Sequence, residues 1–274
     1  MQFPTHSQNI LKFIREIRFS LVQDTDDFAI DKFSALCRLF EEFQDFEYDV
    51  SDDYAIIHQD GFDIYFPLPL PRIKLEHIAC GYAKWLFNKY SLDGFVQVEQ
   101  GDTIIDCGAF VGGFSIACAK TAELLIAIEP SAKNYWSLER NLRGYDNVLV
   151  LRSALGDKPG ISKLNCSTSD VEHSLMVPDD QSIEHQETVS VLTIEDLVKT
   201  IGISKIDFLK VEAEGYEPEI ITGMEHISPR KIAVDVSPER GGDSPALEIR
   251  KDLESRNYEC RQRGHVLFAK IIAA

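Results

Sequence analysis

The chain has little that would tie it to nucleic acid. Its 274 residues contain 28 Lys and Arg against 45 Asp and Glu, a formal net charge of −17. A phosphate backbone is repelled by such a surface, and no long basic cluster offsets the repulsion. We therefore expect no nucleic-acid partner.

Signals for metal, disulfide, secretion and membrane are also missing. None of the six cysteines forms a Cys-x-x-Cys pair, and their spacing suggests neither a zinc site nor a disulfide framework. The first residues lack a basic region followed by an apolar one, and no apolar run approaches a membrane span. We expect a cytoplasmic protein in a reducing compartment, with no signal peptide and no membrane contact.

What is present is the composition of a globular protein, with 44% hydrophobic and 27% charged residues. One stretch, residues 101–115, organises the rest. Thr103 to Asp106 reads as a short buried strand, and an apolar helical pattern starts at Phe114. Between them lie Gly108, Gly112 and Gly113. A strand, a glycine turn and a helix N-terminus place a ligand at the carboxyl ends of a parallel sheet.

The spacing of these glycines indicates which ligand. A dinucleotide fingerprint needs Gly-x-Gly-x-x-Gly, but Phe110 occupies the middle glycine position and would crowd a pyrophosphate. Asp106 stands two residues before Gly108, where an acid suits a ligand with a cationic amino group. S-adenosylmethionine (SAM) has such a group. The alternative is a structural turn that binds nothing. We predict cofactor contacts from Asp106, Gly108, Phe110 and Gly112.

From residue 95 onward, strand and helix patterns alternate, which predicts a doubly wound, mostly parallel α/β sheet. The last two strands, at 258–263 and 266–271, suit an antiparallel hairpin at the sheet edge. Glu129 ends the second strand, where a carboxylate can accept both ribose hydroxyls of an adenosyl group. Ser153 and Ala154 follow the third strand and are placed to border adenine. A polar segment at 167–186 predicts loops.

Residues 1–93 carry no readable motif. Apolar spacing predicts helices at 9–22, 27–43 and 73–90, and a hairpin whose turn contains Asp60-Gly61. We place a boundary near residue 93, between an N-terminal helical and hairpin extension (1–93) and a sheet domain (94–274). The extension can serve as a lid over the substrate, as a packing layer or as the surface of a homo-oligomer.

Four segments together resemble the FkbM family of methyltransferases: residues 106–115, 128–130, 153–157 and 209–217. Their order and spacing match across about residues 95–272. The resemblance implies a class I methyltransferase fold and SAM-dependent methylation, mostly of hydroxyl groups on secondary metabolites or sugars. One position departs from the family pattern Lys-x-Asp-x-Glu-Gly, because Glu212 stands where the family usually has Asp.

Transfer of a methyl group to a hydroxyl benefits from a base that takes the hydroxyl proton. The candidates at the carboxyl ends of the fourth and fifth strands are Glu212, Asp235 and Lys210, the last only if burial lowers its pKa. His173 and His265 can reach in from loops. Glu212, Glu214 and Glu217 can instead hold Mg²⁺, although Glu214 and Glu217 also suit the start of the next helix.

We therefore predict a SAM-dependent O-methyltransferase that acts on a small molecule. Because Glu212 departs from the family pattern, an alternative prediction is a SAM-binding partner protein that has lost catalysis. An NAD-dependent oxidoreductase is a further alternative, disfavoured by Phe110. N-methylation is a variant of the main prediction.

Overall fold

The computed structural model describes residues 46–68, 70, 72–167, 174–175 and 183–272. The helices predicted at 9–22 and 27–43 lie outside these residues. At the centre is a seven-stranded sheet with the order β12-β13-β11-β10-β4-β5-β6. Its strands are β4 (Thr103–Cys107), β5 (Leu124–Ile128), β6 (Val148–Leu151), β10 (Phe208–Val211), β11 (Lys231–Asp235), β12 (Tyr258–Arg263) and β13 (Val266–Ile271).

Only β13 runs against its neighbours in this sheet. It pairs antiparallel with both β11 and β12, whereas the pairs from β11 through β10, β4 and β5 to β6 are parallel. In chain order the seven strands lie as 6-7-5-4-1-2-3. This order with one reversed strand is that of class I methyltransferases, so the predicted fold class and edge hairpin are confirmed.

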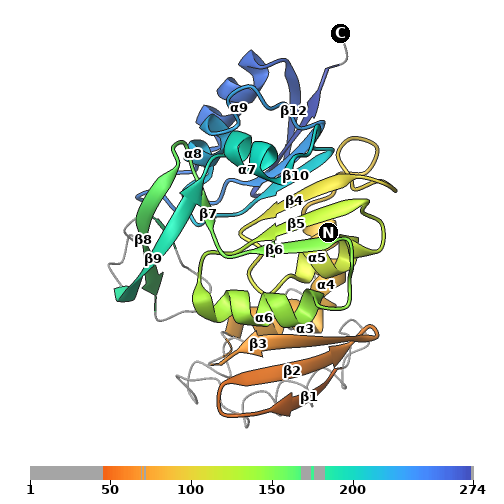
Figure 1. Cartoon of the computed structure of the whole chain (residues 1–274). Coiled ribbons are helices and arrows are strands. Elements are labelled where there is room, and N and C mark those ends of the chain that lie inside the picture. Colours follow the sequence, from red (N-terminus) through yellow and green to blue (C-terminus); the bar gives the residue numbers. More distant parts are fainter. Residues whose placement is uncertain (1–45, 69, 71, 168–173, 176–182, 273–274) are drawn as a thin grey trace.

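Helices cover both faces of the sheet (Figure 1). One face carries α4 (Tyr82–Lys89), α5 (Gly113–Ala119) and α6 (Ala132–Leu142). The other carries α7 (Ile194–Ile201), α8 (Glu217–Thr222) and α9 (Ala246–Ser255). Alternate residues of each strand supply the two cores: Ile104 faces the first, and Ile105 the second.

The N-terminal segment forms a second layer beyond α6 (Figure 1). Its small sheet contains β1 (Glu47–Val50), β2 (Tyr54–Gln59) and β3 (Phe62–Pro67). The β2–β3 hairpin turns at Asp60-Gly61, both with positive φ, as a type I′ turn requires. The backbone of Tyr65 exchanges two hydrogen bonds with the Asn141 side chain of α6. The hairpin is confirmed, while the division of the chain at residue 93 stays a prediction.

Two expectations about secondary structure were wrong. The predicted helix at 73–90 is two helices, α3 (Arg72–Ala79) and α4, because Gly81 adopts a left-handed φ of 76° and breaks the run. The loops predicted at 167–186 are only partly correct, because β8 (Gly160–Ser167) ends in that range and β9 (Ile183–Leu192) begins in it, while residues 168–173 and 176–182 lie outside the described part of the chain. With β7 (Ala154–Leu155), these strands form a separate sheet in the order β7-β9-β8.

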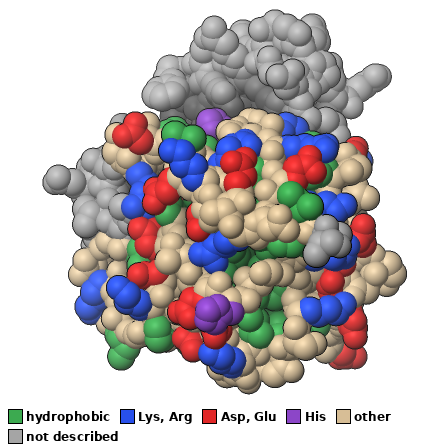
Figure 2. Space-filling model, turned by 90° about the horizontal axis from the view of Figure 1, so that it is seen from above, with side chains coloured by type: hydrophobic (Ala, Val, Ile, Leu, Met, Phe, Trp, Pro, Cys, Tyr) green, Lys and Arg blue, Asp and Glu red, His purple; other side chains and the backbone are tan. Residues whose placement is uncertain are grey.

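On the molecular face seen in Figure 2, Lys and Arg side chains are interspersed with Asp and Glu. Mixed charges of this kind pair locally, as Arg256 does with Asp252 at 3.1 Å. Within the part of the chain that the structure describes, no helix is both long and apolar enough to cross a membrane.

Candidate functional site

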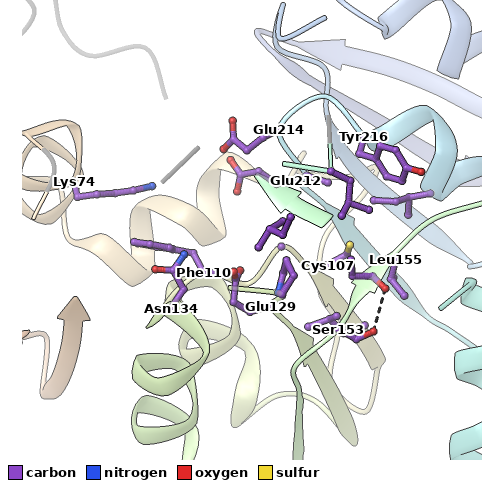
Figure 3. Close-up of a pocket in the computed structure, with 18 residues that line it drawn as sticks. Lys74, Cys107, Phe110, Glu129, Asn134, Ser153, Leu155, Glu212, Glu214 and Tyr216 are labelled. Atoms are coloured by element: carbon purple, nitrogen blue, oxygen red, sulfur yellow. Dashed lines mark hydrogen bonds between the residues drawn. The ribbon is translucent and has the colours of Figure 1, made fainter. Parts of the chain in front are cut away.

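A cavity lies at the carboxyl ends of β4, β5 and β10, where the strand–turn–helix motif predicts a ligand. It holds about 710 Å³ of space, part of which opens to solvent. Figure 3 shows Glu129 and Asn134 on one side, Glu212 and Glu214 on another, and Lys74 pointing in from the N-terminal segment. The site therefore combines residues from the sheet domain and from the extension.

The glycine turn after β4 is shaped by a close approach to β10. Gly108 has a φ of 70°, and a Cβ there would lie 1.7 Å from the carbonyl oxygen of Glu212. Only glycine permits both the left-handed backbone and this contact. Gly108 lines the cavity as predicted. Gly112 does not: a Cβ there would meet Leu138 of α6 at 2.7 Å, which indicates a packing position.

Asp106 is fully buried and already holds internal partners. Its carboxylate lies 3.1 Å from the ammonium of Lys210 and accepts a hydrogen bond of 2.6 Å from the Ser115 hydroxyl. It is not among the residues that line the cavity. Direct binding of a cofactor amino group by Asp106 stays a prediction, and the geometry favours an indirect role through Lys210.

Lys210 does not meet the condition for a base. Burial by itself would lower the pKa of its ammonium, but the Asp106 and Glu212 carboxylates more than offset this and raise it. The ammonium donates to the carbonyls of Cys107 (3.2 Å) and Gly108 (2.7 Å). A charged lysine in this position holds the turn together and cannot accept a proton.

Glu129 forms part of the cavity wall and is 5% exposed. One of its oxygens accepts the backbone N–H of Phe110, and the other accepts that of Ser131, each at 3.0 Å. Burial raises the pKa of Glu129 to about 7, although the backbone bonds and the Asn134 side chain favour the ionised form. These bonds fix a carboxylate that still has lone pairs available to a ligand.

The part of the cavity wall near Glu129 is mostly apolar. Ile128, Leu155 and Leu164 line it together with Ser153 and Ala154. The Ser153 hydroxyl donates to the carbonyls of Ala154 (3.2 Å) and Ser190 (2.9 Å). Ser153 and Ala154 thus lie at the cavity, although their contact with adenine stays a prediction.

Glu212 lies between two lysines. Its carboxylate is 2.6 Å from the Lys89 ammonium and 3.3 Å from that of Lys210. Burial alone would raise the pKa of Glu212, but these cations and Lys74 hold it well below its ordinary value. An ionised, paired carboxylate is a weak base, so the geometry favours a positioning role.

Glu214 differs from Glu212 in its environment. It lines the cavity with a left-handed φ of 49°, which is uncommon for a residue with a side chain. Burial, followed by the negative charges of Glu239 and Glu212, raises its pKa well above the ordinary value. A carboxyl of raised pKa on a constrained backbone at a cavity is typical of a group that exchanges protons.

The other predicted catalytic residues lie nearby or outside the described part of the chain. Asp235 is buried, lies 2.9 Å from the Lys89 ammonium and accepts the backbone N–H of Ser237 at 2.8 Å. His265 is exposed in the β12–β13 turn, and His173 lies outside the described residues. Glu217 is buried and accepts the N–H groups of Ala213 and Gly215, so it holds its own loop.

Sequence reasoning missed three residues of this region. Lys74 and Lys89 come from the extension, where no motif marks them. Asn134 lies in the first turn of the helix that follows Glu129, and it lines the cavity. The sequence does carry a signal for Asn134, because it is a polar residue in the first turn of the helix that follows Glu129.

A model of the family described as the methyltransferase FkbM domain matches residues 106–260, more than half of the chain. The chain belongs to the FkbM methyltransferase family. The match begins at Asp106 and spans the glycine turn, Glu129 and the Glu212–Glu217 loop. The resemblance seen in the sequence is therefore confirmed.

Relatives are distant. A hexuronic acid methyltransferase, AglP, from Haloferax volcanii is 26% identical over 129 residues, which make up 47% of this chain and 52% of AglP. This chain thus spans about half the length of that curated relative. The crystal structure of a methyltransferase FkbM from Methylobacillus flagellatus KT is 19% identical, with a TM-score of 0.46 over 71% of this chain and 52% of that chain. A magnesium protoporphyrin IX methyltransferase from Synechocystis PCC 6803, solved with bound SAM, is 14% identical, with a TM-score of 0.44 over 74% of this chain and 85% of that one.

Proposed function

We propose that this FkbM family member is a SAM-dependent methyltransferase that methylates a hydroxyl group of a small molecule. One observation carries the proposal. A single cavity has a fixed carboxylate, Glu129, beside an apolar slot on one side and a carboxylate-rich wall of Glu212 and Glu214 on another.

The donor set fits an adenosyl sulfonium ligand. Glu129 would accept the ribose hydroxyls, and Ile128 and Leu155 would contact the adenine ring, bordered by Ser153. Glu214, once ionised, would match a positive charge, whereas Glu212 is already paired with Lys89 and Lys210. When bound, SAM supplies a methyl group activated by its sulfonium sulfur.

The chain itself must hold the acceptor and take up its proton. Glu214 is the best placed base, because it faces the cavity and its pKa is raised. A positive charge in the cavity lowers that pKa and favours the ionised carboxylate. Glu212 and its lysines orient the loop that carries Glu214. Glu214 therefore takes the role of base for which Lys210 was a candidate.

A carboxylated sugar is the acceptor class that we favour. Support comes from the name of the relative AglP, a hexuronic acid methyltransferase, and from Lys74, whose cation faces the cavity.

The two clusters of metal-capable side chains among the described residues do not include Glu212 or Glu214. Lys89 and Lys210 already neutralise Glu212, so Mg²⁺ would gain little there. A cytoplasmic location and a homo-oligomer stay predictions.

The first test is calorimetric titration with S-adenosylhomocysteine and, separately, with NAD. We expect micromolar binding of S-adenosylhomocysteine only. Glu129→Ala should weaken it at least about tenfold, the loss of roughly one charge-assisted hydrogen bond. Glu139→Ala, on the exposed side of α6, is the matched control and should change nothing. Melting temperatures check that both variants fold.

The outcomes separate the alternatives. Absence of S-adenosylhomocysteine binding would overturn the proposal, and NAD binding would favour an oxidoreductase. Cofactor binding without turnover, on a panel of neutral and carboxylated sugars with and without Mg²⁺, would favour the inactive partner protein. With an active acceptor, Glu214→Gln should remove the rise of kcat/KM with pH that an ionising base produces.

A further inference from the structure

A second group of ligand-type side chains lies on the β8–β9 hairpin. Cys166 of β8 stands directly opposite His185 of β9, and Glu187 follows two residues later on the same face. The Cys166 sulfur lies 3.9 Å from Glu187 Oε1, and His185 Nε2 lies 3.6 Å from that same oxygen. All three ligand atoms lie within 4.8 Å of one another.

These spacings match a metal site. With metal–sulfur bonds of about 2.3 Å and metal–nitrogen or metal–oxygen bonds of about 2.0–2.2 Å, tetrahedral ligands lie roughly 3.3–3.6 Å apart. The nitrogen–oxygen distance lies within this range, and the sulfur–oxygen distance of 3.9 Å lies a few tenths of an ångström above it. The sulfur–nitrogen distance is below 4.8 Å, so side-chain rotations that move these atoms by about an ångström would bring all three around one ion.

The Glu187 carboxylate is oriented for such a role. Its other oxygen, Oε2, is 2.6 Å from the Arg152 guanidinium and accepts the backbone N–H of Ala132 at 3.0 Å. Oε1 is thereby turned toward the sulfur and the imidazole. Metal-binding carboxylates are commonly held by hydrogen bonds of this kind. A register shift between Cys166 and Ser167 interrupts the ladder at this point, as bulges beside functional sites do.

We propose that Cys166, His185 and Glu187 form a zinc site, separate from the proposed cofactor cavity. One thiolate, one imidazole and one carboxylate are the ligand types that zinc prefers. Water can complete the tetrahedron, because the His185 side chain is 56% exposed and lines a groove open to solvent together with Glu187, Asp52 and Trp136.

The site would stiffen one wall of the cofactor cavity. Both strands that it joins belong to the small sheet, in which β9 pairs with β7. Ala154 and Leu155 of β7 and Leu164 of β8 line the cavity. Zinc should therefore stabilise the β8–β9 hairpin and, through it, these residues of the cavity wall.

The second cluster of possible ligands, Glu195, Glu225 and His226, is a natural control. It lacks sulfur, and Lys199 already pairs with Glu195. Carboxylates and one exposed imidazole bind zinc more weakly than a site that contains a thiolate.

The experiment uses the full chain without a metal-binding tag, stripped with a chelator under reducing conditions. Zinc content after dialysis measures stoichiometry, and titration with Co²⁺ reports coordination. We expect one zinc per chain, a thiolate-to-cobalt charge-transfer band and the strong visible bands of tetrahedral cobalt. Cys166→Ser and His185→Ala should each weaken binding by more than about 100-fold, because loss of a ligand exceeds the loss of an outer partner.

His226→Ala and Cys260→Ser are the matched controls and should bind like the parent. Zinc should raise the melting temperature of the parent and of the controls, but not that of Cys166→Ser. Less than half an equivalent of zinc in the parent, or a charge-transfer band that survives Cys166→Ser, would overturn the proposal. Circular dichroism of the metal-free variants shows whether they fold.

Discussion

At the scale of single residues, Lys74 brings a cation into a cavity otherwise rich in acids. Its ammonium lies 4.6 Å from the centre of the Phe110 ring. Among the described residues none forms an ion pair with it. Burial lowers its pKa, and the carboxylates of Glu212 and Glu214 only partly oppose this. A cation in such surroundings is stabilised by an anionic ligand group, from the methionine end of the cofactor or from the acceptor.

Lys74→Met should distinguish the two sources. If Lys74 holds the cofactor carboxylate, binding of S-adenosylhomocysteine weakens about tenfold or more, as expected for a charge-assisted hydrogen bond. Methylthioadenosine, which lacks the amino-acid portion, should bind unchanged. If Lys74 instead holds an acceptor carboxylate, only the KM for the acidic sugar rises. Equal weakening of both adenosyl ligands would contradict a charge role, and Lys74→Arg should restore most of the binding.

At the scale of elements, the contact between the β4–α5 turn and the end of β10 is the tightest constraint on the site. Gly108→Ala should lower the free energy of unfolding by more than about 3 kcal/mol, because the added Cβ collides with the Glu212 carbonyl. Gly101→Ala is the matched control. It has a φ of 83° but nothing within 4 Å of a Cβ, so strain alone should cost about 1 kcal/mol. Urea denaturation measures both, and equal losses would contradict the collision.

The first turn of α8 should make stability depend on pH. Burial, followed by lesser effects that include the Asp235 charge, raises the pKa of Glu217 to about 7, although the N–H groups of Ala213 and Gly215 favour ionisation. The folded state therefore binds the proton more tightly than the unfolded state, whose pKa is near the ordinary 4.5. This contribution is complete below the unfolded pKa and is lost as the pH rises through about 7.

Glu217→Gln tests this directly. One oxygen of Glu217 accepts both backbone bonds, and a glutamine oxygen can do the same without ionising. The variant should be more stable than the parent above about pH 7, by roughly 1–3 kcal/mol, and should show a flatter pH profile. Thermal melts from acid to mildly alkaline pH measure the difference. Glu248→Gln, in the exposed first turn of α9, should follow the parent.

At the scale of the whole molecule, Lys89 ties the N-terminal segment to the site. Its ammonium contacts the carboxylates of Glu212, at the end of β10, and Asp235, at the end of β11. Helix α4, which carries Lys89, packs so closely on α5 that a Cβ on Gly113 would lie 2.4 Å from Tyr82. The extension, through Lys89, therefore helps to hold the carboxylates of Glu212 and Asp235 in place.

Lys89→Met should remove the cation that lies between Glu212 and Asp235, and Glu212 would keep only its longer contact with Lys210. We expect a loss of about 2–4 kcal/mol in the free energy of unfolding and a rise in the pKa of Glu212. Lys84→Met, exposed on the same helix, is the control and should cost little. Denaturant unfolding measures both. Similar free energies of unfolding for the two variants would show that the Lys89 ion pairs contribute little to stability.

Features read over a short stretch of chain were predicted well. The glycine turn, the edge hairpin and the Asp60-Gly61 turn each depend on residues that are neighbours in the chain. Glu129 was found because it follows a buried strand at a fixed place in the sheet. The pairing of β8 with β9 was missed because the two strands are separated by a long polar segment without periodicity.

The sequence by itself determined the sheet type, the family and the position of the cavity, because each is encoded in local patterns of hydrophobicity and glycine. Only the tertiary structure decided the electrostatics. It placed Lys210 against Asp106, and Lys89 between Glu212 and Asp235, and it brought Cys166 opposite His185. The charge state of a buried group depends on neighbours that are distant in the chain. No local pattern could therefore show that Lys210 stays charged while Glu214 favours its proton.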